Sequence, residues 1–468
     1  MSFTLMIFLL AFLPAYLIFH TLVPSTRGKN IVLLVFSCLF YAYGGIPCLL
    51  LLLADALLGF QAGRLLEKTH HKRYLVLPII VWLGLLGVFK YAGFFGKNIG
   101  ALFGDPLMVH LALPMGISFY TFKLISYLAD VWQDRCPAEK SPLSFLCYVT
   151  TFHQVLQGPI VRYPDMREAL HERTVNREAM ISGLVRFSTG LFKKAVLADY
   201  CGTLADTLLP LDGSIGTVPK AGLWIGSVLF TMQIYLDFSA YSDMAIALGT
   251  MSGFTCPENF NYPYAAVSVK DFWRRWHISL STWFRDYLYI PLGGSRKGLP
   301  RTILNLGFVF LITGLWHGPV WTFVVWGAMN GTLVIIERLL GLNREKERPA
   351  LLNAVLHVYC VLAFTLCFVV FNSDSLRHAG AYFLAMAGLS PEPPLHSLLY
   401  FTDIVPGAVM CLAAALSTPL FSKLIRPQSD GISAARTALQ DIFLLAVLVL
   451  SAASIMSADY NPFIYFRF

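Results

Sequence analysis

Long apolar runs recur along this chain and limit what it can fold into. The run at 350–372, ALLNAVLHVYCVLAFTLCFVVFN, contains no Asp, Glu, Lys or Arg. It matches the roughly 20 residues that a helix needs to cross about 30 Å of hydrocarbon. The mean hydropathy of the whole chain, +0.63, reflects many such runs. The sequence therefore predicts an all-α membrane protein that crosses the bilayer several times.

We expect a single membrane-embedded domain over residues 1–468, without internal repeats or a soluble domain. About eleven helices should span the bilayer, accompanied by re-entrant and interfacial helices. The runs at 30–43 and 302–316 are short for a span and are candidates for re-entrant or broken helices. The predicted helices are 4–23, 30–43, 47–65, 74–95, 110–131, 143–158, 181–203, 221–248, 302–316, 320–338, 350–372, 403–422 and 437–456.

The net charge of +8 does not point to nucleic acid in such a chain, because Lys and Arg collect in the cytoplasmic loops of membrane proteins. If the N-terminus lies outside, the main basic clusters fall on the cytoplasmic side, and the C-terminus also lies outside. The nine cysteines show no CxxC pair and no zinc-ligand spacing. We therefore expect neither a disulfide framework nor a bound metal.

A histidine lies inside one of the apolar runs, in the sequence Leu-Trp-His-Gly-Pro with His317 at its centre. The helix that carries it must end near Gly318 and Pro319, since proline blocks continuation and glycine permits an exit turn. A broken helix at membrane depth has to be buried in protein or line a cavity. A neutral imidazole there suits a general base that deprotonates a hydroxyl. The alternative is a hydrogen-bonded packing histidine.

A second histidine, His277, lies in the segment DFWRRWHISLSTWFRDYLYIPLGG at 271–294. Read as one helix over 271–290, this segment places its aromatic residues and His277 on one face and its arginines on much of the remainder. Asp271 can pair with Arg275 at i, i+4. The pattern is typical of an interfacial helix on the cytoplasmic membrane surface. The alternative is a simple anchor in which the histidine is incidental.

Other polar groups lie at awkward depth. Asp237 and Asp243 in YLDFSAYSDMAIA either orient a catalytic imidazole or tie helices together, and the second interpretation is favoured. His153 and Gln157 precede another break, at Gly158-Pro159. Lys123 is expected to face the bundle interior.

Several segments together resemble the membrane-bound O-acyltransferases, and within them the alginate O-acetyltransferase branch. These segments are LPMGISFYTFKLISYLADVW, QGPIVRY, YLDFSAYSDMAIALG, ENFNYPY, DFWRRWHISLSTWFRDYLYIPLGGSRKG, LWHGPVWTFVVWG and the C-terminal NPFIYFRF. That branch also includes peptidoglycan O-acetylation and teichoic acid D-alanyl transfer proteins. The resemblance implies that His317 is the catalytic histidine and His277 the second active-site histidine. Two positions depart from the family pattern, Lys123 and His153.

The resemblance implies acyl transfer across a bacterial inner membrane through a central tunnel, without a bound cofactor. A cytoplasmic thioester, acetyl-CoA or an acyl carrier protein, would dock near 271–301, with Trp273, Arg274 and Arg275 as candidate contacts. His277 would orient the thioester or stabilise charge on its carbonyl. The acceptor would be a hydroxyl of an extracytoplasmic polysaccharide, a partner protein or a lipid-linked glycan. The rival hypotheses are a secondary transporter and a non-catalytic scaffold of a polysaccharide export complex.

The C-terminal segment 461–468 contains four aromatic residues and one arginine. One interpretation is an aromatic belt that anchors the last helix at the interface. The other is a tail that folds back, so that the Tyr465 hydroxyl receives the acyl group with His317 as its base. The free hydroxyl is a poor nucleophile because the pKa of tyrosine is near 10.

Overall fold

The computed structural model describes residues 1–104, 111–211, 214–342, 348–390, 409, 412–414, 417–418, 434–457 and 463–464. Within these ranges the chain is helical and has no strand, as predicted. It divides into two compact units. The first comprises 1–187, 241–258 and 285–287, and the second comprises 188–240, 259–284 and 288–468. Helix α11 (Lys220–Met251) contributes residues to both units. The expectation of a single domain stays a prediction.

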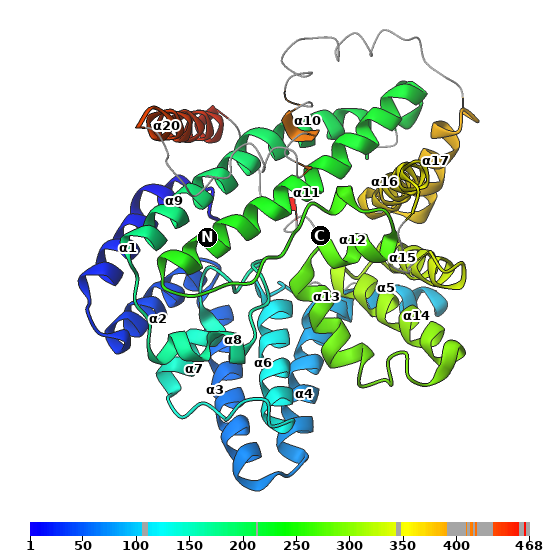
Figure 1. The fold of residues 1–468 in the computed structure, drawn as a ribbon. Coiled ribbons are helices and arrows are strands. Elements are labelled where there is room, and N and C mark those ends of the chain that lie inside the picture. Colours follow the sequence, from blue (N-terminus) through cyan, green and yellow to red (C-terminus); the bar gives the residue numbers. More distant parts are fainter. Residues whose placement is uncertain are drawn as a thin grey trace. The chain divides into compact units, whose positions relative to one another are not determined.

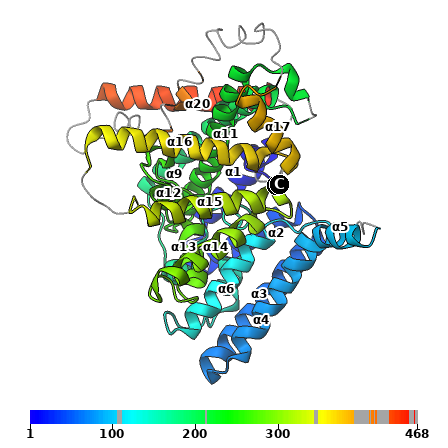
Figure 2. The same ribbon diagram turned by 90° about the vertical axis from the view of Figure 1, so that its right-hand side faces the viewer.

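The first unit is built from the N-terminal helices, drawn from blue to cyan in Figure 1. Its elements are η1 (Phe8–Phe12), α1 (Leu13–Leu22), α2 (Thr26–Ala42), α3 (Ile46–Thr69), α4 (Arg73–Leu86), η2 (Gly87–Tyr91), α5 (Ala92–Leu102), α6 (Ile117–Trp132), α7 (Pro142–Thr150), α8 (Tyr163–His171) and the first part of α9 (Arg177–Phe192). Helices α3, α4 and α6 pack lengthwise against one another (Figure 2). Small residues allow this approach, since a Cβ at Gly63 would meet the Tyr127 ring at 2.5 Å.

The second unit surrounds the two histidine segments. Its elements are η3 (Lys193–Ala198), α10 (Asp199–Leu208), η4 (Ser214–Thr217), the first part of α11, η5 (Pro263–Ala265), α12 (Val269–Arg275), α13 (Ile278–Phe284), part of η6 (Arg285–Tyr289), α14 (Gly298–His317), α15 (Trp321–Leu339), α16 (Ala350–Asn372), α17 (Leu376–Met386) and α20 (Ala434–Ser457). Buried side chains from η3, α10, α11, α12, α15, α16 and α17 form one continuous apolar cluster.

Helices α14 and α15 form a tight antiparallel pair that fixes the position of His317 (Figure 1). At their crossing the two backbones touch through glycines. A Cβ at Gly314 would lie 2.3 Å from the Phe323 carbonyl oxygen, and one at Gly327 would lie 2.5 Å from that of Phe310. Close backbone approach through glycine is a common way for helices to associate in membranes. A larger side chain at either glycine would push the two helices apart.

Five helical segments in the described residues are long and apolar enough to cross a membrane. They are Ile46–Thr69, Arg73–Leu102, Lys220–Met251, Gly298–His317 and Ala350–Asn372. The run predicted as 302–316 begins four residues earlier, at Gly298, and thereby reaches spanning length. The chain is therefore a multi-pass membrane protein, and α4 presents Leu77, Ile80 and Leu83 outward.

Two helix predictions were wrong. The helix predicted over 143–158 ends at Thr150, and residues 151–162 are irregular, buried backbone. The helix predicted over 271–290 is broken at Trp276 and His277 into α12 and α13. The shared face predicted for this segment is therefore not continuous. The predicted helix 403–422 lies almost wholly outside the described residues.

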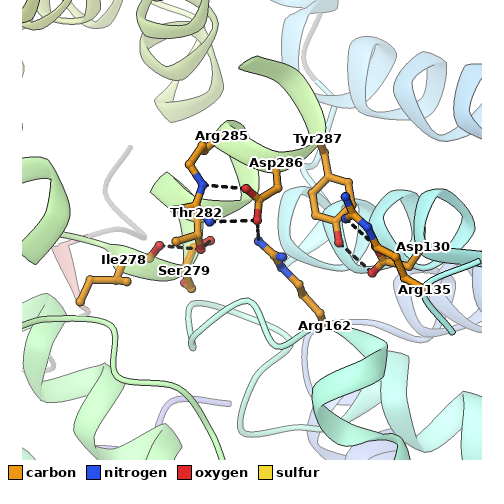
Figure 3. Close-up of polar contacts among 9 residues, drawn as sticks. All are labelled: Asp130, Arg135, Arg162, Ile278, Ser279, Thr282, Arg285, Asp286 and Tyr287. Carbon is orange, nitrogen blue, oxygen red and sulfur yellow. Dashed lines mark hydrogen bonds and ion pairs between the residues drawn. The ribbon is translucent and has the colours of Figure 1, made fainter. Parts of the chain in front are cut away.

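Residues 285–287 are tied to the first unit by polar contacts (Figure 3). Asp286 accepts hydrogen bonds from Arg162 at 2.8 Å and from Arg285 at 2.6 Å. The Tyr287 hydroxyl donates to Asp130 at 2.7 Å, and Arg135 pairs with the same carboxylate. Burial alone would raise the pKa of Asp286, but the two arginines outweigh it and hold that pKa below its usual value. These contacts explain why this short segment belongs to the first unit.

Candidate active site

His317 is the last residue of α14, where Gly318 and Pro319 end the helix as predicted. Its imidazole is half-buried and surrounded by aromatic rings. Ring centroids lie 5.0 Å away for Trp316, 5.0 Å for Trp326, 5.5 Å for Phe371 and 6.4 Å for Phe323. We call these four side chains the aromatic cluster. They surround the imidazole, which remains partly exposed.

His277 lies between α12 and α13 in an unusual backbone conformation. Its φ angle is +43°, in the left-handed region that side chains other than glycine and asparagine rarely adopt. Such conformations persist when surrounding contacts enforce them, and they occur often at functional sites. The ring is 1% exposed, and Phe238 packs against it with centroids 4.7 Å apart.

Asn259 supplies the contacts that enforce this conformation. Its side-chain Oδ1 accepts hydrogen bonds from the backbone N–H and the hydroxyl of Ser279 at 3.1 and 2.8 Å. Its backbone oxygen accepts from the Ile278 N–H at 2.9 Å. The same Oδ1 lies 3.2 Å from Nδ1 of His277. Because a backbone N–H can only donate, this atom of Asn259 is the oxygen, and Nδ1 of His277 must carry the proton. Nε2 therefore carries the lone pair.

The electrostatic setting keeps His277 neutral. Burial, and secondly the positive charge of a protonated His317, hold the pKa of His277 well below its ordinary value. The Trp316 ring lies beside both imidazoles, with its centroid 6.2 Å from that of His277 and 5.0 Å from that of His317. Within the described residues, Nε2 of His277 has no hydrogen-bond partner. A buried, neutral and unpaired acceptor nitrogen is suited to hold a hydroxyl or to accept a proton.

Glu337, near the end of α15, fixes the start of α12. Its buried carboxylate accepts hydrogen bonds from the backbone N–H groups of Val269 at 2.6 Å and Lys270 at 3.2 Å. The Ser268 hydroxyl caps the same helix end by accepting from the Asp271 N–H at 3.0 Å. A carboxylate at a helix N-terminus satisfies free N–H groups and complements the helix dipole. Helix α12, which leads into His277, is thus held rigidly on the α14–α15 pair.

Trp273 lies among these aromatic side chains, with its ring centroid 5.9 Å from that of Trp326. The indole N–H groups of Trp273 and Trp326 are buried and have no partner in the described part of the chain. Buried donors are seldom left unpaired without a functional reason. The Trp326 indole thus supplies a donor beside His317, and Trp273 supplies a second donor next to Trp326.

The two predicted arginines differ. Arg274 is exposed, whereas Arg275 pairs with Asp271 at 3.0 Å, as the i, i+4 spacing predicted. Arg296, Lys297 and Arg301 are also exposed, so the surface around 271–301 offers several solvated cations in the second unit.

Both predicted aspartates in α11 form ion pairs with basic residues of earlier helices. Asp237 pairs with Lys194 of η3 at 2.6 Å. Asp243 pairs with Arg186 of α9 at 2.8 Å, and Arg186 also binds Glu258. Each ion pair therefore links α11 to an earlier helix.

Whereas His277 and His317 belong to the second unit, His153 and Gln157 belong to the first. Both are fully buried in the irregular segment after α7, and their side-chain nitrogen and oxygen atoms lack partners among the described residues. Lys123 faces the interior, as expected, and its ammonium donates to the Tyr148 carbonyl at 2.5 Å and to Gln154 at 3.0 Å. Tyr465 lies outside the described residues.

Sequence reasoning missed Asn259, Glu337 and Lys194, because their partners are distant in the chain. Asn259 lies in the family-like segment ENFNYPY, which was the one available signal. In the described part of the chain, no group of three or more His, Cys, Asp or Glu side chains is placed to hold a metal ion.

Comparison with known proteins places this arrangement in a family. Residues 65–371 match the model of the membrane-bound O-acyltransferase family, a range that contains both histidines. The chain is 36% identical to the probable alginate O-acetylase AlgI of Pseudomonas putida, with both chains covered completely. It is 40% identical to the protein of the same name from Pseudomonas aeruginosa, over 82% of this chain and 75% of that one. It is 32% identical to the peptidoglycan O-acetyltransferase of Helicobacter pylori, over 82% and 79% of the two chains. The chain therefore belongs to the membrane-bound O-acyltransferase family, and it is an O-acyltransferase.

Proposed function

We propose that this enzyme moves an acetyl group from a cytoplasmic thioester to hydroxyl groups of an extracytoplasmic polysaccharide, directly or through a partner protein. The observation that carries the proposal is that half-buried His317 and buried His277 both lie beside the Trp316 ring. The names of the AlgI relatives favour a polyuronate such as alginate as the acceptor. Peptidoglycan O-acetylation and teichoic acid D-alanyl transfer are the alternatives within the family.

In the proposed reaction His317 acts as the general base. It removes the proton from the acceptor hydroxyl as the oxygen attacks the thioester carbonyl carbon. The carbon–sulfur bond then breaks, and the proton passes to the departing thiolate, which yields an ester and a free thiol. His277, with its lone pair on Nε2, accepts a hydrogen bond from a neighbouring hydroxyl of the acceptor and so positions the attacking hydroxyl, whose own proton goes to His317. This tautomer cannot donate to the thioester carbonyl from Nε2, so the indole N–H groups of Trp273 and Trp326 take that role.

The donor is acetyl-CoA or an acyl carrier protein, and no bound cofactor is required. The exposed cations Arg274, Arg296, Lys297 and Arg301 suit the phosphates of coenzyme A or an acidic carrier. We further propose about eleven spanning helices around a central tunnel, in a bacterial inner membrane, with the donor side cytoplasmic.

The first test is His317→Ala. Loss of a general base costs about 10²–10⁴ in rate, and the variant should insert and fold normally because the imidazole edge is partly exposed. Polymer acetylation is measured in cells that lack the wild-type gene. Full acetylation by the variant would contradict the assignment and favour a non-catalytic scaffold.

The second test addresses the side of the donor. Sealed vesicles of known orientation are supplied with labelled acetyl-CoA, or with a labelled acyl carrier, on one side only. Transfer is expected only from the cytoplasmic side. Transfer driven only by donor on the outer side would reverse the proposed topology.

A further inference from the structure

A buried ion pair in the second unit has a third partner, the C-terminal segment. Lys194 and Asp237 are 2% and 1% exposed, and their charged atoms lie 2.6 Å apart. Desolvation of two charges opposes the folded state, and apolar residues of similar size are often equally stable. Because the pair itself adds little stability, its role follows from the other groups that its two side chains bind. Asp199 also binds the Lys194 ammonium, at 2.7 Å.

Each oxygen of the Asp237 carboxylate has a different partner. Oδ1 accepts from Lys194, while Oδ2 accepts from the backbone N–H of Ile464 at 2.8 Å. The Lys194 ammonium also lies 4.8 Å from the centroid of the Phe463 ring, a cation–π contact. Phe463 and Ile464 are 0% and 4% exposed. Chain ends are usually mobile unless something ties them down, so this main-chain bond and burial constitute a built docking site.

The docking site adjoins the two histidines. Asp237 holds Ile464, and the next residue of α11, Phe238, packs on the His277 ring at 4.7 Å. Ile464 also belongs to the same continuous apolar cluster as Trp326 and Phe371, which flank His317. The anchored point of the tail thus lies beside the helix that carries Phe238, and in the same apolar cluster as the rings that flank His317.

We propose that Asp237, charged and oriented by Lys194, is a positioning residue that anchors the C-terminal segment beside the two histidines, and that acyl transfer requires this anchoring. The requirement for transfer rests on the proposed function, whereas the anchoring itself does not. The recognition is through a backbone amide, so it depends on the main chain of residue 464 more than on its side chain.

Two variants of the full-length protein, Ile464→Pro and Asp237→Asn, test the anchor, and Ile464→Val is the control. Ile464→Pro removes the amide donor and leaves the buried ion pair intact, whereas Ile464→Val keeps the donor and a branched side chain. Asp237→Asn removes the charge and keeps the shape. Hydrogen exchange of the C-terminal peptide reports anchoring directly, and acetyl transfer from labelled acetyl-CoA is measured on the same samples.

Charge-assisted hydrogen bonds of this kind correspond to about a 10- to 100-fold change in an equilibrium. We expect Ile464→Pro and Asp237→Asn to lose exchange protection by that factor and to lose transfer in kcat more than in donor KM. The control Ile464→Val should keep both the exchange protection and the acyl transfer of the wild type. Unchanged protection in Ile464→Pro and Asp237→Asn would overturn the anchor. Lost protection with full transfer would overturn its role in the reaction. A wild-type protein that shows protection but no acyl transfer would contradict the proposed function and leave the anchor standing.

Discussion

Nδ1 of His277 donates a hydrogen bond to Oδ1 of Asn259 across 3.2 Å, and this single oxygen also accepts both hydrogen bonds of Ser279. Asn259 therefore sets the backbone turn, the ring orientation and the tautomer of the histidine together. A residue with this role should affect catalysis through its neighbour, without touching the substrate.

Replacing Asn259 tests that role. Asn259→Ala leaves buried donors without an acceptor, at a cost of about 1–3 kcal/mol, and should lower activity with little change in donor binding. Asn259→Asp keeps the oxygen but adds a negative charge, which raises the pKa of His277. Neutral His277 is then lost at a higher pH, so the acidic limb of the kcat/KM profile should move upward. The pH–rate profiles of both variants are the measurement, and an unmoved acidic limb in Asn259→Asp would contradict this account.

His277→Ala should lower acyl transfer by about 10² because the buried acceptor nitrogen is lost. Alanine also disfavours the left-handed backbone, so a matched variant is needed. His277→Asn tolerates this conformation and removes the imidazole. Both variants should be impaired alike in single-turnover assays. Normal turnover in His277→Asn would show that the residue serves only as part of an interfacial anchor.

Glu139, in the loop after α6, gives a prediction for stability against pH. Burial would raise its pKa, but hydrogen bonds from the Tyr163 hydroxyl at 2.6 Å and the Ser141 N–H at 2.7 Å, with His171, hold the pKa below its usual value. A lowered pKa in the folded state adds stability above the unfolded pKa, near 4.3, and that stability is lost as the pH falls through the folded value. Tyr163→Phe should therefore destabilise the detergent-solubilised protein by about 1–2 kcal/mol at pH 7. The difference in thermal unfolding should shrink below pH 4, and a gap that is constant with pH would argue against the ionised hydrogen bond.

Tyr465→Phe separates the two interpretations of the C-terminal aromatic residues. Phe463 is buried and Ile464 is buried in the apolar cluster, whereas residues of an aromatic belt lie at the lipid–water interface. In a relay the tyrosine oxygen attacks the thioester, its proton passes through His317 to the departing thiolate, and a tyrosyl ester forms. The acceptor hydroxyl then attacks this ester, and its proton returns to the tyrosine oxygen. The relay predicts that the variant folds but loses transfer and that the wild type yields an acyl-tyrosine by mass spectrometry, whereas direct transfer predicts an active variant and no such ester. Full activity of Tyr465→Phe without that ester would leave the belt interpretation.

Features encoded by neighbouring residues were predictable from the sequence. Apolar length gave α16 to the residue, and Gly318-Pro319 gave the end of α14, because both signals are local. The break at His277 carries no glycine or proline. The break is imposed by Asn259, 18 residues upstream. The segment itself has a helical pattern, so the sequence predicted an unbroken helix. The partner of Asp237 is likewise 43 residues away. The two candidate histidines could be named from the sequence, but the residues that hold them in place could not.

The left-handed backbone at residue 277 lowers the stability of the fold, while the imidazole it carries is proposed to serve catalysis. A non-glycine residue in this region is disfavoured by roughly 1–2 kcal/mol, which glycine would avoid. Selection for thermostability alone would thus tend to replace this histidine, and a library screened only for folded protein should drift towards glycine there. Retention of the imidazole marks position 277 as one where activity and stability conflict.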